Sequence, residues 1–213
     1  MEWNNRMYQK HPTPYQGIAG FIERARIKSV LKFTAIKPND AVLEIGCEAG
    51  NLLFQCTNAK RIVGADISLN ALQDACRLFK SNNRSAEFFH IDAQLPLPFL
   101  KGEFSVIICS EVLEHVPDPR SVLENIYRIS NADTRILITI PTEVTKLFIK
   151  NVLRKLRIFH LLFPGIEENQ SEWHIHTFSK NKLFSLNHDL FKISRSTLVW
   201  LNHFVALMRI KPN

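Results

Sequence analysis

Short apolar runs alternate with stretches of helical spacing along most of the chain. From Gly17 towards Ala35, apolar residues recur every three or four positions, which predicts a helix before the first apolar run. Further helical stretches follow Ser68, Asp118 and Ser179, and each of these side chains can cap a helix N-terminus. The apolar runs between the helical stretches predict buried strands at 41–45, 61–66, 86–90, 104–110 and 135–141.

The end of the chain has a different pattern. Two apolar stretches, at about 193–199 and 204–210, are joined by a short Trp200–His203 turn, which predicts an antiparallel hairpin. Strands that alternate with helices are typical of a parallel sheet covered on both faces. We therefore expect an α/β fold: a Rossmann-like, doubly wound, seven-stranded sheet that is mostly parallel and ends in an antiparallel hairpin.

The expected fold forms one domain with recognisable segments. We expect a cofactor-binding core that is preceded by an N-terminal segment with a lid helix. An amphipathic lid interrupts the chain after the fifth strand, before a final helix and the hairpin. In order, these segments are 1–40 (N-terminal segment and lid helix), 41–141 (core), 142–178 (inserted lid) and 179–213 (helix and hairpin).

Composition narrows the class of protein. The 213 residues are 46% hydrophobic and 22% charged, which suits one globular domain, and the net charge of +7 favours nucleic acid, anionic lipid or phosphorylated partners without choosing among them. Four scattered cysteines without a C-x-x-C pair indicate reduced thiols. A polar N-terminus and the lack of a long apolar run predict a cytoplasmic protein that is at most peripheral to a membrane.

The candidate chemistry gathers where the first three strands end. The stretch AVLEIGCEAG places Gly46 and Gly50 in a turn after the first strand, and Glu44, Asp66 and Asp92 lie at the ends of successive strands. Asp66 follows Glu44 at roughly the 20-residue spacing of an acid that meets ribose hydroxyls, which favours an adenosine-containing ligand. The dinucleotide fingerprint G-x-G-x-x-G is absent, and an acid would repel a pyrophosphate. A ligand with a sulfonium and an amino group tolerates this acidic rim, which favours S-adenosylmethionine.

Several ordered segments resemble one family. VLEIGCEAGNL resembles motif I of the class I S-adenosylmethionine-dependent methyltransferases of the small-molecule type, and GADIS resembles their second acidic motif. FFHIDAQLPLPF, CSEVLEHVPDP, LITIPTE and HIHTFSKNKLFSL are similar to the segments that follow in that family. The resemblance covers about residues 17–210, and it implies an enzyme that uses S-adenosylmethionine and no metal.

The resemblance also implies roles for particular residues. Asp66 with Ile67 would bind the ribose, Asp92 with the Ala93 backbone would face the adenine, and Ser110 with Glu111 would lie near the sulfonium. The residues that would border the methionine part of the cofactor are Glu44, Gly46, Cys47 and Gly50. Glu48 departs from the family, because most relatives carry glycine there, so we expect a displaced loop or weakened cofactor binding.

Methyl transfer needs mainly the placement of an acceptor opposite the sulfonium. A hydroxyl acceptor would also need a base, and His115, His174 and His176 are the candidates, against the alternative that they are structural or solvated. Tyr15 and Glu143 are candidate substrate contacts, although an ordinary packed tyrosine is an equal alternative for Tyr15.

The segment 144–163 contains no acid and has one basic and one apolar side at helical spacing. It is either a lid packed on the core with a solvated basic face, or a site for an anionic membrane or a phosphorylated or lipid-linked acceptor. The leading hypothesis is therefore methyl transfer to a small-molecule, lipid-linked or glycan-linked acceptor. RNA methylation is less favoured because no added RNA-binding module is present, and a non-catalytic partner protein with the same fold is the third alternative.

Overall fold

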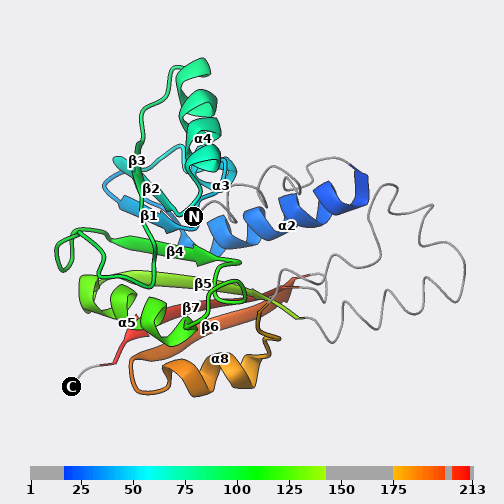
Figure 1. Cartoon of the computed structure of the whole chain (residues 1–213), viewed down its shortest axis with the longest axis vertical. Helices are drawn as coiled ribbons and strands as arrows, with labels where there is room; N and C mark the ends of the chain where they lie inside the picture. The colour runs from blue at the N-terminus through cyan, green and yellow to red at the C-terminus, as the bar shows by residue number, and fades with distance from the viewer. Residues whose placement is uncertain (1–16, 143–174, 200–202, 212–213) are drawn as a thin grey trace, which may run out of the picture.

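The computed structural model describes residues 17–142, 175–199 and 203–211, and strands alternate with helices along most of that length (Figure 1). The strands are β1 (Ala41–Ile45), β2 (Arg61–Asp66), β3 (Glu87–His90), β4 (Val106–Ser110), β5 (Arg135–Pro141), β6 (Phe191–Val199) and β7 (His203–Ile210). The helices are α2 (Gly17–Thr34), α3 (Asn51–Phe54), α4 (Leu69–Ser81), α5 (Pro119–Ile129) and α8 (Lys180–Asn187).

All of these strands belong to one seven-stranded sheet with the order β3-β2-β1-β4-β5-β7-β6. The pairs among β1 to β5 are parallel, whereas β7 pairs antiparallel with both β5 and β6. The predicted fold class is confirmed, including the terminal antiparallel hairpin. The strand order reverses between β1 and β4, and the crevice beyond the carboxyl ends of the strands at such a point is where doubly wound sheets bind ligands.

Helix starts follow the capping residues that the sequence offers. The Ser68 hydroxyl accepts a hydrogen bond from the Ala71 N–H at the start of α4. The Asp118 carboxylate, just before Pro119 at the start of α5, accepts from the N–H groups of Arg120 and Ser121. Ser179 caps α8 in the same way. Some ends differ from the expected positions: β4 starts at Val106 instead of Phe104, because the chain bends at Ser105, and the final helix, which the sequence predicts to run to Leu190, stops at Asn187.

The two faces of the sheet carry separate hydrophobic cores. One core packs α5 and α8 against the sheet through side chains such as Leu123, Ile126 and Leu183. The other packs α2, α3 and α4 against the opposite face through side chains such as Val30 and Leu53. Because β1, β4 and β5 are covered on both faces, their side chains are almost all buried, as the continuous apolar runs predict.

Charge pairing fixes the amino-terminal edge of the sheet. Asp40, just before β1, accepts a hydrogen bond from the Ser105 hydroxyl at 2.7 Å and pairs with the Arg135 guanidinium at the start of β5. Its carboxylate also accepts from the Lys37 N–H at 2.5 Å. Burial alone would raise the pKa of Asp40, but these hydrogen bonds outweigh burial and lower it. The ends of β1, β4 and β5 are therefore tied together at this edge.

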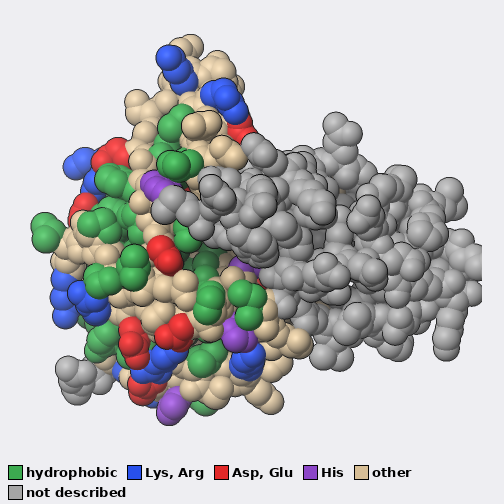
Figure 2. Space-filling view, viewed as in Figure 1, with side chains coloured by type: hydrophobic (Ala, Val, Ile, Leu, Met, Phe, Trp, Pro, Cys, Tyr) green, Lys and Arg blue, Asp and Glu red, His purple; other side chains and the backbone are tan. Residues whose placement is uncertain are grey.

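One face of the molecule does not concentrate the positive charge that the composition predicts. On the face shown in Figure 2, Lys and Arg side chains are scattered and lie beside acidic ones, without a continuous basic patch among the described residues. Cys47, Cys56 and Cys109 are buried, and Cys76 is exposed. In the described ranges, no helix combines the length and the apolarity that a bilayer crossing requires.

Candidate functional site

A tight turn after β1 forms the centre of the site. Gly46 and Gly50 both adopt left-handed backbone conformations, with φ of 71° and 75°. The N–H groups of Gly46 and Cys47 donate to the Ala65 carbonyl of β2 at 2.7 and 3.1 Å. A Cβ atom at Gly46 would lie 2.2 Å from a methyl carbon of Val112, so only glycine fits there without displacing that side chain. The turn is thus packed against the loop that follows β4.

Glu48 adopts the left-handed conformation in place of the glycine that the family motif has. Its φ is 49°, and its N–H donates to Asp66 Oδ2 at 2.8 Å. A non-glycine residue in this region carries strain of about 1 to 2 kcal/mol. The hydrogen bond shows that the turn stays attached to the end of β2, with the strain held at Glu48.

Asp66 ends β2 with its carboxylate turned towards this turn. Oδ1 accepts from the Ser68 N–H at 2.8 Å while Oδ2 accepts from Glu48. Burial raises the pKa of Asp66, and the backbone donors at Ser68, Glu48 and Ile67 offset part of that increase. Each carboxylate oxygen has more than one lone pair, so Asp66 keeps capacity for a ligand's hydroxyl groups.

The loop after β3 positions the third acid. Asp92 Oδ1 accepts from the Gln94 N–H at 2.9 Å, which closes a local turn. The Ala93 carbonyl accepts from the Asn125 side-chain amide of α5 at 3.0 Å. The Ile91 N–H donates to the Asp66 carbonyl at 3.0 Å, so the ends of β2 and β3 are directly joined. The structure therefore brings Asp66, Asp92 and Ala93 to one edge.

Glu44 is a buried carboxylate that lacks a complete hydrogen-bond shell. It lies on β1 facing α2, it is 3% exposed, and its Oε2 atom has no partner among the described residues. Burial raises the pKa of Glu44 well above its ordinary range, and the charges of Asp66 and Glu48 add to this, while Arg26 acts in the opposite direction. Such a group is costly for stability unless something else uses it.

Arg26 of α2 supplies a buried positive charge at the same edge. It is 8% exposed, pairs with Glu23 on its own helix and donates to the Ser110 hydroxyl at the end of β4. Burial alone would lower the pKa of Arg26, but Glu23, Glu111 and Glu44 raise it. The guanidinium therefore stays charged among acids. The sequence interpretation missed Arg26, because a basic residue on an amphipathic helix carries no local sign of being buried.

A chain of polar side chains continues from Ser110 across the neighbouring strands. Ser110 Oγ lies 2.8 Å from Thr139 Oγ1 on β5, and the Thr139 hydroxyl donates to Glu111 Oε1 at 2.9 Å. Glu111 Oε2 lies 3.4 Å from Nε2 of His203 at the start of β7. Thr139 and His203 were not expected in the site. A lone hydroxyl inside the apolar run ILITIP was a signal for Thr139, whereas His203 had none.

Two of the three histidines proposed as bases lie at the loop after β4. His115 Nε2 is 3.9 Å from Glu114 Oε1, and His176 Nε2 lies 3.1 Å from the Pro117 carbonyl oxygen. The backbone N–H groups of Ile175 and His176 donate to the Glu114 carbonyl, which attaches the segment before α8 to this loop. His174 lies outside the described residues, as do Tyr15, Glu143 and the basic segment 144–163.

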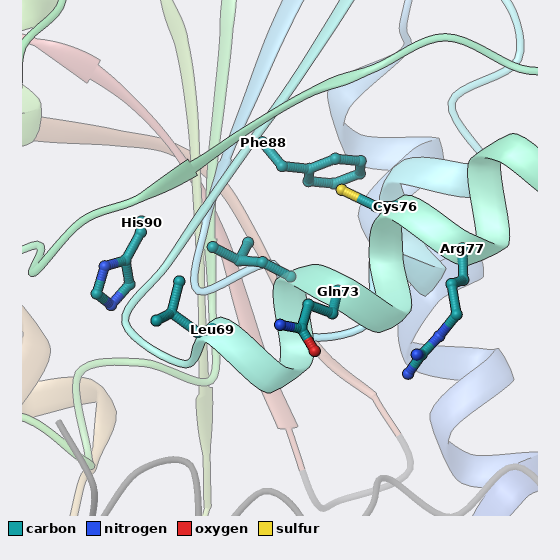
Figure 3. Close-up of a pocket in the computed structure, with 7 residues that line it drawn as sticks. Leu69, Gln73, Cys76, Arg77, Phe88 and His90 are labelled. Carbon is teal, nitrogen blue, oxygen red and sulfur yellow. The ribbon is translucent and has the colours of Figure 1, made fainter.

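A shallow hollow of about 420 Å³ lies beside the site, between α4 and the edge strand β3 (Figure 3). Figure 3 shows the Phe88 ring next to Cys76, with Leu69 and His90 at the other end. The His90 ring nitrogen Nε2 lies 3.0 Å from the Ile67 carbonyl oxygen, so this end of the hollow adjoins the loop that carries Asp66. The hollow borders the acidic edge without containing Glu44, Asp66 or Asp92.

Comparisons with known proteins agree with this geometry. The profile of the methyltransferase domain family matches residues 18–190. A ubiquinone biosynthesis O-methyltransferase of Thiobacillus denitrificans is 36% identical over 83 residues, which are 38% of this chain and 36% of that protein. The chain therefore matches little more than a third of the length of that curated relative.

Solved structures show the same fold at low sequence identity. A protein of Pyrococcus horikoshii superposes with a TM-score of 0.73 at 17% identity, covering 97% of this chain and 99% of that one. The N-methyltransferase NodS of Bradyrhizobium japonicum, solved with S-adenosyl-L-homocysteine, superposes with a TM-score of 0.70 at 15% identity and covers 99% of this chain and 98% of its own.

Proposed function

The chain belongs to the methyltransferase domain family, and on that premise we propose that it binds S-adenosylmethionine and transfers the methyl group to a small-molecule acceptor. The observation that carries the proposal is the acidic edge, where Glu44, Asp66 and Asp92 end three adjacent parallel strands around one glycine turn. The cofactor supplies a methyl group on a positively charged sulfur, and an edge of this charge is suited to hold it.

The side chains at this edge fit the parts of the cofactor. The Asp66 carboxylate, supported by Ile67 and Ser68, offers acceptors to the two ribose hydroxyls. Asp92 and the Ala93 backbone offer polar contacts to the adenine at the end of β3. Gly46, Cys47 and Gly50 form a wall of the site along which the backbone can approach a ligand closely.

Glu44 and Arg26 place opposite charges near the start of the glycine turn, and these charges suit the ammonium and carboxylate groups of an amino acid. The orphan Oε2 of Glu44 is a buried acceptor that an ammonium group would satisfy. Arg26 is a fixed guanidinium that a carboxylate would pair with. The methionine part of the cofactor carries both of these groups. Ser110 and Glu111 follow at the end of β4, where we place the sulfonium.

We extend the proposal to a hydroxyl-bearing acceptor, because the curated relatives are named O-methyltransferases. His115 and His176 are candidate bases by their position at the loop after β4, and His174 remains a third. Tyr15 and Glu143 remain proposed acceptor contacts. A lipid-linked acceptor and peripheral attachment of a cytoplasmic protein to an anionic membrane rest on the basic segment 144–163.

Isothermal titration with S-adenosylmethionine and S-adenosylhomocysteine tests the core of the proposal. We expect one site with a Kd in the micromolar range, and Arg26→Met should weaken it by about tenfold or more through the loss of a charge-assisted contact. Lys192→Met, on the surface of β6, is the matched control and should leave the Kd unchanged. Absence of heat at millimolar ligand with the folded wild-type protein would reject cofactor binding.

The acceptor side needs a separate measurement. Salt-sensitive cosedimentation with vesicles that contain anionic lipid is expected if the segment 144–163 binds a membrane, and Lys150→Glu should weaken it. Equal sedimentation of the wild-type protein and Lys150→Glu would reject the proposed membrane attachment and would leave the proposed cofactor binding unaffected.

Glu48 favours one second candidate, a binding protein that keeps the fold without catalysis. Its side chain and strained backbone occupy the position where the family motif has glycine. In that case the protein would bind S-adenosylhomocysteine without transferring a labelled methyl group to any acceptor in a cell extract, and Asp66→Ala would leave its cellular phenotype unchanged.

A further inference from the structure

A row of buried polar side chains crosses the carboxyl edge on the α2 side of the sheet. Arg26 of α2 contacts Ser110, although the two lie 84 residues apart in the sequence. From Ser110 the row continues to Thr139 on the neighbouring strand and then to Glu111. His203 closes the row from β7, where its backbone pairs with Pro141 at the end of β5. Three strands and one helix thus converge on a single carboxylate.

The hydrogen bonds in this row have one consistent direction. A guanidinium can only donate, so the Ser110 oxygen accepts from Arg26. The Ser110 hydrogen is then available to Thr139, whose own hydrogen is donated to Glu111 Oε1 at 2.9 Å. Donors that hold an ionised acceptor strengthen one another in a poorly solvated site. The row therefore ends with Glu111 as its acceptor.

Glu111 itself is held in an unusual conformation. Its φ is 56°, the left-handed region that a residue with a long side chain seldom adopts. Its N–H donates to the Thr139 carbonyl at 3.2 Å, which keeps this conformation in place. Its side chain is 22% exposed, in contrast to the buried members of the row. Backbone strain that the surrounding structure maintains is found mainly at functional sites.

His203 approaches the second oxygen of this carboxylate. The residue is 6% exposed, and its Nε2 lies 3.4 Å from Glu111 Oε2. Its other ring nitrogen, Nδ1, is buried and has no hydrogen-bond partner among the described residues. A histidine that only stabilised the fold would be expected to satisfy both nitrogens. Among the described charged groups on neighbouring elements, Arg26 interacts with Glu111, and Arg26 in turn interacts with Glu23 and Glu44.

Resting on the function and the hydroxyl acceptor proposed above, we infer that Glu111, in place of the candidate histidines His115, His174 and His176, accepts the proton of that hydroxyl. His203 and Thr139 are its positioning residues. The acceptor oxygen forms a bond to the methyl carbon, and the bond from that carbon to sulfur breaks with its electron pair left on sulfur. The hydroxyl proton passes to Glu111, and from there to solvent once the product leaves. An amine acceptor that enters uncharged needs no such base at the moment of transfer.

The same row explains why the carboxylate, rather than the histidine, meets the acceptor. Glu111 is the partly exposed member, whereas both nitrogens of His203 are directed into the protein or towards Glu111. His203 and Thr139 each approach one oxygen of Glu111, so together they hold the carboxylate in a single orientation towards the acceptor. Because Arg26 begins the row, the end of the site that holds the cofactor is connected to the group that takes the proton.

The test compares the wild-type protein with His203→Gln, Glu111→Gln and the control Asn187→Leu. Asn187 is also fully buried with an unpaired oxygen, but it packs on the opposite face against Met208. The probes are S-adenosylhomocysteine for binding, and 3,4-dihydroxybenzoate and benzylamine for transfer of a labelled methyl group. Thermal unfolding of each variant separates a loss of folding from a loss of chemistry.

We expect His203→Gln to keep the Kd for S-adenosylhomocysteine within about twofold of the wild-type value. For 3,4-dihydroxybenzoate its kcat should fall by about 10- to 100-fold with KM little changed, and Glu111→Gln should lose about 100-fold or more. The shape of the profile of rate against pH should differ between the wild-type protein and His203→Gln, because the variant removes the contact with Glu111 Oε2. Asn187→Leu should leave the shape of that profile unchanged.

A readout without turnover tests the pair itself. In histidine-labelled protein with S-adenosylhomocysteine bound, the NMR signals of the His203 ring should shift in Glu111→Gln and stay in place in Asn187→Leu, because only the first variant alters the contact with Glu111 Oε2. Unshifted His203 signals in Glu111→Gln, a His203→Gln rate profile like that of Asn187→Leu, or methyl transfer to benzylamine and not to the catechol would each overturn the inference. Failure of the wild-type protein to bind S-adenosylhomocysteine would instead reject the proposed function.

Discussion

The acidic residues at the two ends of β1 differ in their hydrogen-bond partners. At the amino end, Asp40 is surrounded by donors: the Lys37 N–H, the Ser105 hydroxyl and the Arg135 guanidinium. At the carboxyl end, Glu44 is equally buried, but one of its oxygens has no partner among the residues that the structure describes. Only five residues of strand separate these ends. The pKa is lowered at Asp40 and raised at Glu44.

This difference indicates that one edge of the sheet contributes to stability and the other to ligand binding. A paired buried acid stabilises the folded state at neutral pH, whereas an unpaired one destabilises it until a ligand supplies the missing partner. The amino edge of the sheet is therefore the structural edge, and the carboxyl edge is held ready for a ligand. Variants that remove a paired acid at the first edge should lower stability and leave binding intact, whereas variants at the second edge should change binding and should not lower stability.

The largest expected effect is on stability, from Asp40→Ala. Removal of this carboxylate leaves the Arg135 guanidinium buried without its partner and should lower the free energy of unfolding by about 3 kcal/mol. The Kd for S-adenosylhomocysteine should stay within about twofold, because no contact of Asp40 reaches the carboxyl edge. Urea unfolding and isothermal titration measure the two quantities. A large loss of affinity for S-adenosylhomocysteine in folded Asp40→Ala would show that the two edges do not act independently.

Asp66→Ala should have the largest effect on binding. It removes the acceptors proposed for the ribose hydroxyls and should raise the Kd for S-adenosylhomocysteine about 100-fold, since hydrogen bonds to a charged group contribute about 1.5 to 3 kcal/mol each. Asp74→Ala is the control, because Asp74 is an acid of α4 that pairs with Arg77 at the surface. Affinity that survives in Asp66→Ala would mean that the ligand does not use the end of β2.

The sequence predicts the cofactor half of the carboxyl edge because the signals there are local. Glu44, Gly46 and Gly50 lie in one turn, and Asp66 is held by backbone N–H groups of its own loop and of that turn. Capping by Ser68 and by Asp118 likewise depends on neighbours along the chain. Such interactions need only a strand, a turn and a helix start, and these can be predicted from periodicity and residue type.

The row from Arg26 to His203 is different because side chains from distant positions build it. Arg26 and His203 come from the first and last described elements and meet Ser110 and Glu111 only after the sheet has formed. Neither residue has a neighbour in sequence that indicates burial or a polar partner. The ends of α8 and β4 shifted for a related reason, because tertiary contacts rather than propensity decide them.

Glu44→Gln should stabilise the ligand-free protein while weakening binding. The pKa of Glu44 is raised in the folded state, so the folded protein holds the proton more tightly than the unfolded chain, and stability falls as pH rises above the ordinary value of about 4.3. The variant should therefore gain about 1 to 2 kcal/mol at neutral pH and little below pH 4.

Asp40→Asn gives the opposite sign and serves as the control for Glu44→Gln. The lowered pKa of Asp40 contributes stability above its unfolded value of about 3.9, and that contribution disappears as pH falls through the folded value. The difference in unfolding free energy between wild type and each variant, measured by urea titration from pH 3 to 8, tests both signs. A Glu44→Gln protein that is less stable than wild type at pH 7 would contradict the assignment of Glu44 to the ligand.

The smallest expected effect comes from Glu48→Gly, and it bears most directly on how the cofactor edge departs from the family motif. Relief of the left-handed strain at Glu48 should raise the free energy of unfolding by about 0.5 to 1 kcal/mol. Ala35→Gly is the matched control, because Ala35 has a φ of 44° at the end of α2, far from the acids. It should gain a similar amount of stability with no change in binding.

Only Glu48→Gly should tighten S-adenosylhomocysteine binding, by about threefold, because the Cβ and carboxylate leave a turn whose backbone faces the ligand while the N–H to Asp66 remains. Weaker binding would show that the Glu48 carboxylate is a ligand contact in its own right. In that case the left-handed conformation of Glu48, like that of Glu111, persists because the side chain has a function. The carboxyl edge then holds two non-glycine residues in the left-handed region for function.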